Sequence, residues 1–124
     1  MAKRILIVDD TPEICRLLSV ALSAAGWQVQ TASDAETARQ LERHACFDVV
    51  LTDLHMPGES GCELVHWIAQ HCPETRTLLM SGGGPGCDEC PMEPRCPFLR
   101  KPFRLAEALA FVNRAAAAGA ATSA

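Results

Sequence analysis

The sequence has no long hydrophobic run. Near its start, four apolar residues at positions 5–8 follow Lys3 and Arg4 and end at two aspartates. A signal-peptide core needs about 7–15 apolar residues, and a membrane-spanning helix needs about 20. We therefore expect neither a secretory signal nor a membrane partner, and the expected location is the cytoplasm.

The sequence also lacks an excess of basic residues. Eleven Lys and Arg stand against fifteen Asp and Glu, which gives a formal net charge of −4. No basic patch stands out to meet phosphates, so direct nucleic-acid binding is not expected. The composition, 48% hydrophobic and 21% charged over 124 residues, is that of one globular domain that folds without a disulfide or metal.

Seven cysteines without a secretory signal favour free thiols over a disulfide framework. Four of them, Cys15, Cys46, Cys62 and Cys72, are interpreted as small hydrophobic side chains of helices and loops. The other three lie close together in the sequence and raise a separate question, taken up below.

Internal repeats and linkers are absent too, and two kinds of segment alternate along the chain. Short apolar runs predict strands that are buried on both faces, and apolar residues every three or four positions predict amphipathic helices. The predicted strands are 4–8, 27–31, 47–52, 77–80 and 97–100. The second of these alternates in polarity, which places it near a sheet edge.

Capping residues mark the predicted helices. Thr11 followed by Pro12 starts the first helix, which ends at Gly26. Ser33 and Ser60 each stand three residues before a glutamate, as in a capping box, and start the next two. The last helix carries Leu105, Ala108, Leu109 and Val112. This order predicts an α/β fold with a parallel sheet covered by helices on both faces.

Polar residues follow four of the predicted strands, at the ends where an open parallel sheet binds its ligands. Asp9 and Asp10 end the first strand, Asp53 the third, Ser81 the fourth and Lys101 the fifth. Three carboxylates at one rim repel each other and favour a hard cation such as Mg²⁺. With its charge shielded by the cation, Asp53 is suited to attack a phosphoryl group. Lys101 can neutralise one phosphoryl oxygen, and the Ser81 hydroxyl can donate a hydrogen bond to another.

Four segments resemble the motifs of response-regulator receiver domains, in the same order along the chain. They are residues 5–10, 48–58, 80–82 and 99–103. The resemblance covers nearly the whole chain and implies a flavodoxin-like (βα)5 doubly wound parallel sheet with strand order 2-1-3-4-5. The receiver domain is expected to span residues 1–118, and the Ala-rich residues 119–124 are expected to fray.

The resemblance also implies roles for the acidic residues. Asp53 would be the phosphorylation site. Asp10, Asp53 and the backbone carbonyl of His55 would ligate Mg²⁺ directly, and Asp9 would act largely through water. These assignments are carried over from the family's motif, position by position.

Three further residues acquire implied roles in the same way. Lys101 would precede a cis peptide bond to Pro102 and point at the phosphoryl group. Ser81 and Phe98 match the family's switch pair, in which the hydroxyl moves toward the phosphoryl group and the ring turns inward. Phe98 lacks the hydroxyl of the Tyr found in many relatives, so a plain core role for this ring stays open beside a switch role.

The function implied is that of a phosphoacceptor in a two-component phosphorelay. A histidine kinase or phosphotransfer domain would donate the phosphoryl group, and phosphorylation would switch the binding of an output partner, which makes the chain a signalling domain rather than an enzyme. A pseudo-receiver that is never phosphorylated stays open as an alternative, as does a hydrolase of the haloacid-dehalogenase type. Hydrolases of that type require a second aspartate at the position where this chain has His55. The cognate kinase, the output partner and the choice between monomer and homodimer stay open.

The segment after Ser81 departs from the family. Residues 82–97 contain four Gly and four Pro, where relatives place the helix between the fourth and fifth strands. Each interior Pro costs a helix about 3 kcal/mol and each Gly about 1 kcal/mol. We therefore predict an irregular loop across 84–95 in place of that helix.

Cys87, Cys90 and Cys96 in this loop leave three interpretations open. They could hold Zn²⁺, they could form a labile Cys87–Cys90 or Cys90–Cys96 bridge, or they could stay unpaired. A fourth zinc ligand would have to be His71, Cys72 or Asp88.

Overall fold

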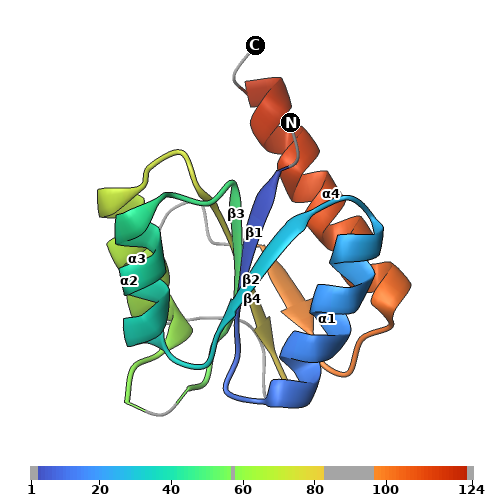
Figure 1. Cartoon of the computed structure of the whole chain (residues 1–124), viewed down its shortest axis with the longest axis horizontal. Coiled ribbons are helices and arrows are strands. Elements are labelled where there is room, and N and C mark those ends of the chain that lie inside the picture. The colour runs from blue at the N-terminus through green and yellow to red at the C-terminus, as the bar shows by residue number, and fades with distance from the viewer. Residues whose placement is uncertain (1–2, 57, 83–96, 123–124) are drawn as a thin grey trace.

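The computed structural model describes residues 3–56, 58–82 and 97–122, the last five of these by their backbone alone (Figure 1). The strands are β1 (Arg4–Val8), β2 (Gln28–Ala32), β3 (Val49–Asp53), β4 (Arg76–Ser81) and β5 (Phe98–Arg100). The helices are α1 (Pro12–Ala24), α2 (Ala35–His44), α3 (Gly61–His71) and α4 (Leu105–Thr122). None of these helices is long and apolar enough to cross a membrane.

The five strands form one parallel sheet of order β2-β1-β3-β4-β5. Helices α2 and α3 cover one face, and α1 and α4 cover the other (Figure 1). The flavodoxin-like fold and the strand order predicted from the sequence are therefore confirmed, with β2 at an edge.

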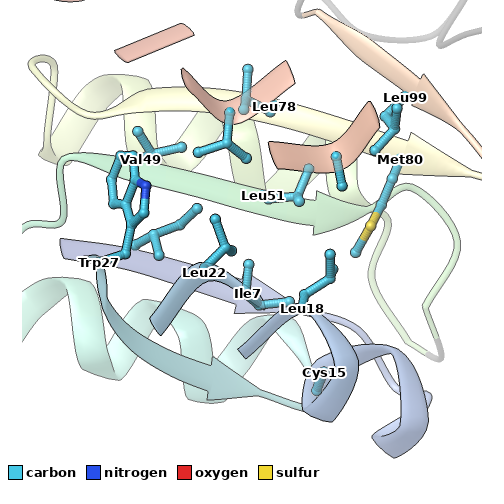
Figure 2. Packing of buried hydrophobic residues seen from close by; sticks show 13 residues of the cluster. Ile7, Cys15, Leu18, Leu22, Trp27, Val49, Leu51, Leu78, Met80 and Leu99 are labelled. Atoms are coloured by element: carbon cyan, nitrogen blue, oxygen red, sulfur yellow. The ribbon is translucent and has the colours of Figure 1, made fainter. Parts of the chain in front are cut away.

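The central strands carry apolar side chains on both faces. In β1, Ile5 and Ile7 join the cluster beneath α1 and α4, whereas Leu6 and Val8 join the cluster beneath α2 and α3. Figure 2 shows the first of these clusters, in which Leu18 and Leu22 of α1 pack on the sheet. Burial on both faces explains why the strand sequence reads as a continuous apolar run.

Three of the predicted helix boundaries are confirmed. Ser60 is the N-cap of α3, and its hydroxyl accepts a hydrogen bond from the Glu63 N–H at 3.2 Å. Thr11 is at the N-cap of α1 with Pro12 in the first turn, although its side chain makes no cap hydrogen bond. Gly26 follows the C-terminal end of α1 with φ +99°, a conformation that glycine adopts without a steric penalty.

The predicted capping box at Ser33 is wrong by one residue. The N-cap of α2 is Asp34, whose carboxylate accepts a hydrogen bond from the Thr37 N–H at 2.7 Å. That backbone hydrogen bond also lowers the pKa of Asp34. A charged oxygen at the helix N-terminus satisfies the same free N–H groups that a serine hydroxyl would, and it also gains from the helix dipole.

The expectation of free thiols is wrong for Cys46 and Cys72, which form a disulfide with a Cα–Cα distance of 5.9 Å. The cause is tertiary: α2 and α3 pack side by side, and each cysteine follows the end of one of these helices. Cys62 is not a free thiol either. Among the described residues, the buried Cys15 is the free cysteine.

The cysteine-rich segment falls in residues 83–96, outside the described part of the chain. The predicted loop and the fate of Cys87, Cys90 and Cys96 therefore stay predictions. One of the suggested fourth zinc ligands, Cys72, is bonded to Cys46 in the disulfide. At the other end, α4 continues through Thr122, whereas residues 119–124 were expected to fray.

One buried carboxylate was not foreseen. Glu42 in the last turn of α2 is 1% exposed. One of its oxygens, Oε1, accepts a hydrogen bond from the Phe47 N–H at 3.4 Å, while Oε2 has no hydrogen-bond partner within the described residues. Burial raises the pKa of Glu42 from 4.5 to about 7. The folded chain therefore favours the protonated acid.

Replacing Glu42 with Gln is expected to change how stability depends on pH. A carboxyl with a raised folded-state pKa stabilises the fold below its unfolded pKa, and this contribution is lost as the pH rises through about 7. Glutamine does not titrate, so the variant should gain up to roughly 3 kcal/mol of unfolding free energy over the unaltered chain between about pH 5 and pH 8. Urea unfolding across this range measures the gap, with the exposed Glu74→Gln as the control. A gap that stays constant with pH would contradict this prediction.

Candidate functional site

The carboxyl ends of the central strands bring the predicted polar residues together. Asp9 directly follows β1, Asp53 is the last residue of β3, Ser81 is the last residue of β4 and Lys101 directly follows β5. One carboxylate oxygen from each of Asp9, Asp10 and Asp53 lies within 4.8 Å of the other two. Asp9 and Asp53 are buried and Asp10 is exposed, so the cluster opens to solvent on one side.

Lys101 joins two of these carboxylates. Its Nζ lies 2.8 Å from Asp9 Oδ2 and 3.4 Å from Asp53 Oδ2. The backbone N–H of Lys101 donates to the Ser81 carbonyl at 2.8 Å, which ties the lysine to the end of β4. The Lys101–Pro102 peptide bond is cis, as predicted.

Burial and charge act in opposite directions on Asp53. Burial raises its pKa, the charge of Lys101 lowers it, and the charge of Asp9 raises it again, with a net rise. Burial would lower the pKa of Lys101, but the hydrogen bond to Asp9 and the charge of Asp53 outweigh it and raise that pKa. The site therefore holds a firmly protonated ammonium among carboxylates that repel one another.

Backbone hydrogen bonds fix the position of Asp53. Its Oδ1 accepts from the His55 N–H at 3.3 Å, and the next residue, Leu54, donates its N–H to the Met80 carbonyl at 2.8 Å. Gly61, the first residue of α3, then donates to the Leu54 carbonyl at 2.8 Å. The carboxylate is thus held between β4 and the start of α3.

Gly61 was not singled out from the sequence. A Cβ atom built on it would lie 2.4 Å from the Asp53 carbonyl oxygen and 3.0 Å from Leu54 Cα, both backbone atoms. Only glycine fits this close approach of α3 to the end of β3. The local sequence carries no signal of it beyond a glycine in the first turn of a helix.

The buried thiol of Cys15 is a second contact that the sequence did not reveal. Its Sγ donates to the Asp9 carbonyl at 3.3 Å, and Thr11 N–H donates to Asp9 Oδ1 at 2.8 Å. Burial, followed by the charge of Asp9, raises the pKa of the Cys15 thiol. Together, these contacts hold Asp9 from the α1 side.

The predicted switch residues lie on neighbouring strands. Ser81 is buried, and Phe98 is half-buried against a small cluster of Leu54, Cys62, Val65 and Leu79. Phe98 pairs in register with Leu79, and Ser81 pairs with Arg100. This arrangement places the hydroxyl and the ring two residues apart along adjacent strands, and a coupled motion of the two stays a prediction.

The donor set suits a hard divalent cation. Three carboxylates and one ammonium carry two net negative charges when all are ionised. Oxygen ligands with a solvent-open side match Mg²⁺, which prefers oxygen donors and retains several waters. The residues present therefore fit the magnesium ion that the resemblance implies.

A doubly wound parallel sheet that gathers three aspartates and a lysine at its carboxyl ends is typical of the receiver class of signalling domains. The chain belongs to the response regulator receiver domain family, whose model matches residues 5–113. Receiver domains of two-component systems are typically phosphorylated, generally bind Mg²⁺ at this acidic pocket and interact with histidine kinases or phosphotransfer proteins.

Known proteins support this assignment. The chain is 35% identical over 82 residues to the response regulator protein PilR of Pseudomonas aeruginosa, covering 66% of the chain and 18% of that protein. It is 33% identical over 116 residues to the DNA-binding transcriptional regulator NtrC of Azospirillum brasilense, covering 92% of the chain and 24% of NtrC. The chain thus spans a quarter or less of the length of both relatives.

A solved structure matches the whole fold. The chemotaxis response regulator CheY4 of Vibrio cholerae superposes with a TM-score of 0.81 at 28% identity, covering 93% of this chain and 99% of CheY4. The receiver domain therefore accounts for nearly all of the described residues.

Proposed function

We propose that this chain accepts a phosphoryl group on Asp53 from a phosphohistidine of a histidine kinase or phosphotransfer domain, and that phosphorylation changes its affinity for an output partner. The observation that carries the proposal is the Lys101 ammonium, which lies 2.8 Å from Asp9 and 3.4 Å from Asp53 beside a cluster of three carboxylates. This arrangement of charge suits the binding of a phosphoryl group at the solvent-open side of the cluster.

The transfer step follows from the placement of the carboxylate. An Asp53 oxygen attacks the phosphorus, a P–O bond forms, and the P–N bond to the donor imidazole breaks as the imidazole leaves. The His55 N–H and the end of β3 hold Asp53 in position, so the main work of the protein is orientation and charge balance. Lys101 then pairs with a phosphoryl oxygen in place of a carboxylate.

The carboxylates also have a role as ligands. Asp10, Asp53 and the His55 backbone carbonyl would hold Mg²⁺, with Asp9 acting largely through water. The bound ion supplies neutralisation of the carboxylates and of the phosphoryl oxygens.

Readout of the phosphorylated state is assigned to Ser81 and Phe98. Ser81 ends β4 at the same end of the sheet as Asp53, and Phe98 lies on the neighbouring strand β5. Movement of the hydroxyl toward a phosphoryl oxygen would open space for the ring to turn inward, and the outer surface near β5 would change. The output partner would recognise that surface.

Replacing Lys101 with Met is expected to slow phosphorylation by about 100-fold, since one preorganised charge at the reacting group contributes about this much. Methionine keeps most of the side-chain length but cannot neutralise a phosphoryl oxygen. The rate is followed by intact mass during incubation with Mg²⁺ and a small phosphodonor, and the exposed Lys3→Met is the matched control. An unchanged rate in Lys101→Met would show that the ammonium has no part in the transfer.

The proposal as a whole is tested by incubation with Mg²⁺ and acetyl phosphate. A mass increase of one phosphoryl group that depends on Mg²⁺ is expected. No increase under any condition would identify a pseudo-receiver, which serves as an interaction module. Continuous consumption of acetyl phosphate as a phosphatase substrate, without a modified protein, would instead identify a hydrolase.

A further inference from the structure

A second cluster of side chains able to bind a metal lies at the amino ends of the strands, whereas Asp53 lies at their carboxyl ends. Glu42 is in the last turn of α2, Cys46 lies two residues beyond the end of that helix, and Cys72 follows α3. One Glu42 carboxylate oxygen and the two sulfur atoms lie within 4.8 Å of one another. Both helices end near the amino ends of β3 and β4, so this cluster is separate from the phosphoacceptor site.

The Glu42 carboxylate is the unusual member. It is 1% exposed, and its Oε2 has no hydrogen-bond partner in the described part of the chain. The Thr75 hydroxyl lies close enough to lower the pKa of Glu42, but its proton is donated to the Phe47 carbonyl at 2.6 Å. A buried carboxylate oxygen left without a partner is costly, and it normally signals an absent ion or water.

The two cysteines face this carboxylate as a disulfide. A dithiol reductant opens it by taking up the bond as its own disulfide, which delivers two electrons and two protons to the Cys46 and Cys72 sulfurs. Two zinc–sulfur bonds of about 2.3 Å at a tetrahedral angle would place the sulfurs about 3.8 Å apart. The Cα–Cα distance of 5.9 Å permits that spacing by side-chain rotation.

We propose that reduced Cys46 and Cys72, together with Glu42, form a binding site for a thiophilic divalent cation such as Zn²⁺. The cation displaces the two thiol protons, and the Glu42 proton where the acid is protonated, to solvent, and it gives Glu42 Oε2 its missing partner. Cys46 is exposed, so the fourth coordination position is open to water. The ends of α2 and α3 are then joined in both redox conditions, by the disulfide when oxidised and by the metal when reduced.

The donor set explains why this site would not compete for Mg²⁺. Thiolates are soft ligands that select zinc, whereas the oxygen-only cluster at Asp9, Asp10 and Asp53 selects magnesium. A cationic side chain lies close by: the Arg4 guanidinium donates to the Cys46 carbonyl at 3.1 Å and lies over the Phe47 ring, and its charge acts on Glu42. That guanidinium balances part of the negative charge of two thiolates and one carboxylate.

The test is zinc uptake by the reduced full chain, with excess Mg²⁺ present to occupy the aspartates. Zn²⁺ is titrated in competition with a chromophoric chelator, for the unaltered chain, Cys46→Ser and Cys15→Ser. Cys46→Ser should bind one equivalent less than the unaltered chain, and the Cys15→Ser control should bind the same amount. Equal uptake by the unaltered chain and Cys46→Ser overturns the proposal.

Two further measurements distinguish loss of the site from misfolding of Cys46→Ser. Co²⁺ added to the reduced unaltered chain should give a thiolate charge-transfer band that loses intensity when a mild thiol oxidant restores the Cys46–Cys72 disulfide. Glu42→Gln should weaken zinc binding about tenfold or more, as loss of a group at a metal site does, while still forming the disulfide on oxidation. The proposal of a three-residue site is overturned if the cobalt band keeps its intensity after oxidation. It is also overturned if Glu42→Gln binds zinc as tightly as the unaltered chain.

Discussion

An Asp53→Asn variant is expected to take up no phosphoryl group from acetyl phosphate under conditions that fully modify the unaltered chain. The asparagine keeps the shape of the side chain and an oxygen to accept the His55 N–H, so the local structure should persist. It has no carboxylate to attack phosphorus, and one of the three clustered charges is gone. Intact mass after incubation with Mg²⁺ and acetyl phosphate measures the loss.

The matched control for this variant is Asp34→Asn. Asp34 is also an aspartate in a loop at the carboxyl edge of the sheet, where it caps α2, and asparagine caps helices equally well. Its variant should be modified to the same extent as the unaltered chain. Full modification of Asp53→Asn, or loss of modification in Asp34→Asn, would mean that the acceptor is a different residue.

A Gly61→Ala variant is expected to lose roughly 2–3 kcal/mol of unfolding free energy, at the upper end of the cost of overpacking. The added Cβ would lie 2.4 Å from the Asp53 carbonyl oxygen, and the atom it meets belongs to the backbone, which cannot rotate away. Helix α3 must therefore shift from the end of β3, taking the Gly61–Leu54 hydrogen bond with it. Urea unfolding measures the loss, and the rate of phosphorylation should fall because Asp53 shifts as well.

Gly82→Ala is the matched control for Gly61→Ala. Gly82 also lies beside the site, next to Ser81, but among the described residues a Cβ there would meet only the Lys101 Cβ, at an ordinary 3.7 Å. Its variant should stay within about 1 kcal/mol of the unaltered chain, because alanine also restricts the unfolded state. If both variants unfold at the same urea concentration, the close approach of α3 to Asp53 does not affect stability, and the prediction is wrong.

The parts of the site that the sequence predicted are those set by topology. Once the apolar runs are interpreted as parallel strands, the residues that follow them must meet at one edge, which places Asp9, Asp53, Ser81 and Lys101 together. Strand order and the cis bond before Pro102 came from the family resemblance rather than from spacing. Both are confirmed by the structure.

The parts that the sequence did not predict depend on how the helices pack against one another. Nothing in the spacing of Cys46 and Cys72, 26 residues apart, shows that the ends of α2 and α3 meet. Glutamate is normally ionised and exposed, and Glu42 lies in a helix of low mean hydropathy, so the sequence around it does not predict its burial. The close approach at Gly61 is likewise a product of tertiary packing.

The error at Ser33 has a different, local cause. Serine and aspartate are both good N-caps and stand next to each other at positions 33 and 34, so the sequence offers two starting points one residue apart. The capping-box spacing to Glu36 favoured the wrong one. The Asp34 carboxylate, as a charged acceptor, is the better partner for the first free N–H groups of α2.

The measurement that tests the central claim most directly is to locate the phosphoryl group itself. Borohydride reduces an aspartyl phosphate to homoserine, and peptide mass spectrometry then identifies the residue that was modified. After incubation with Mg²⁺ and acetyl phosphate, the conversion is predicted at Asp53 and at no other aspartate. Conversion at Asp9 or Asp10, or no conversion in a chain that has gained the mass of a phosphoryl group, would contradict the assignment of Asp53 as the acceptor.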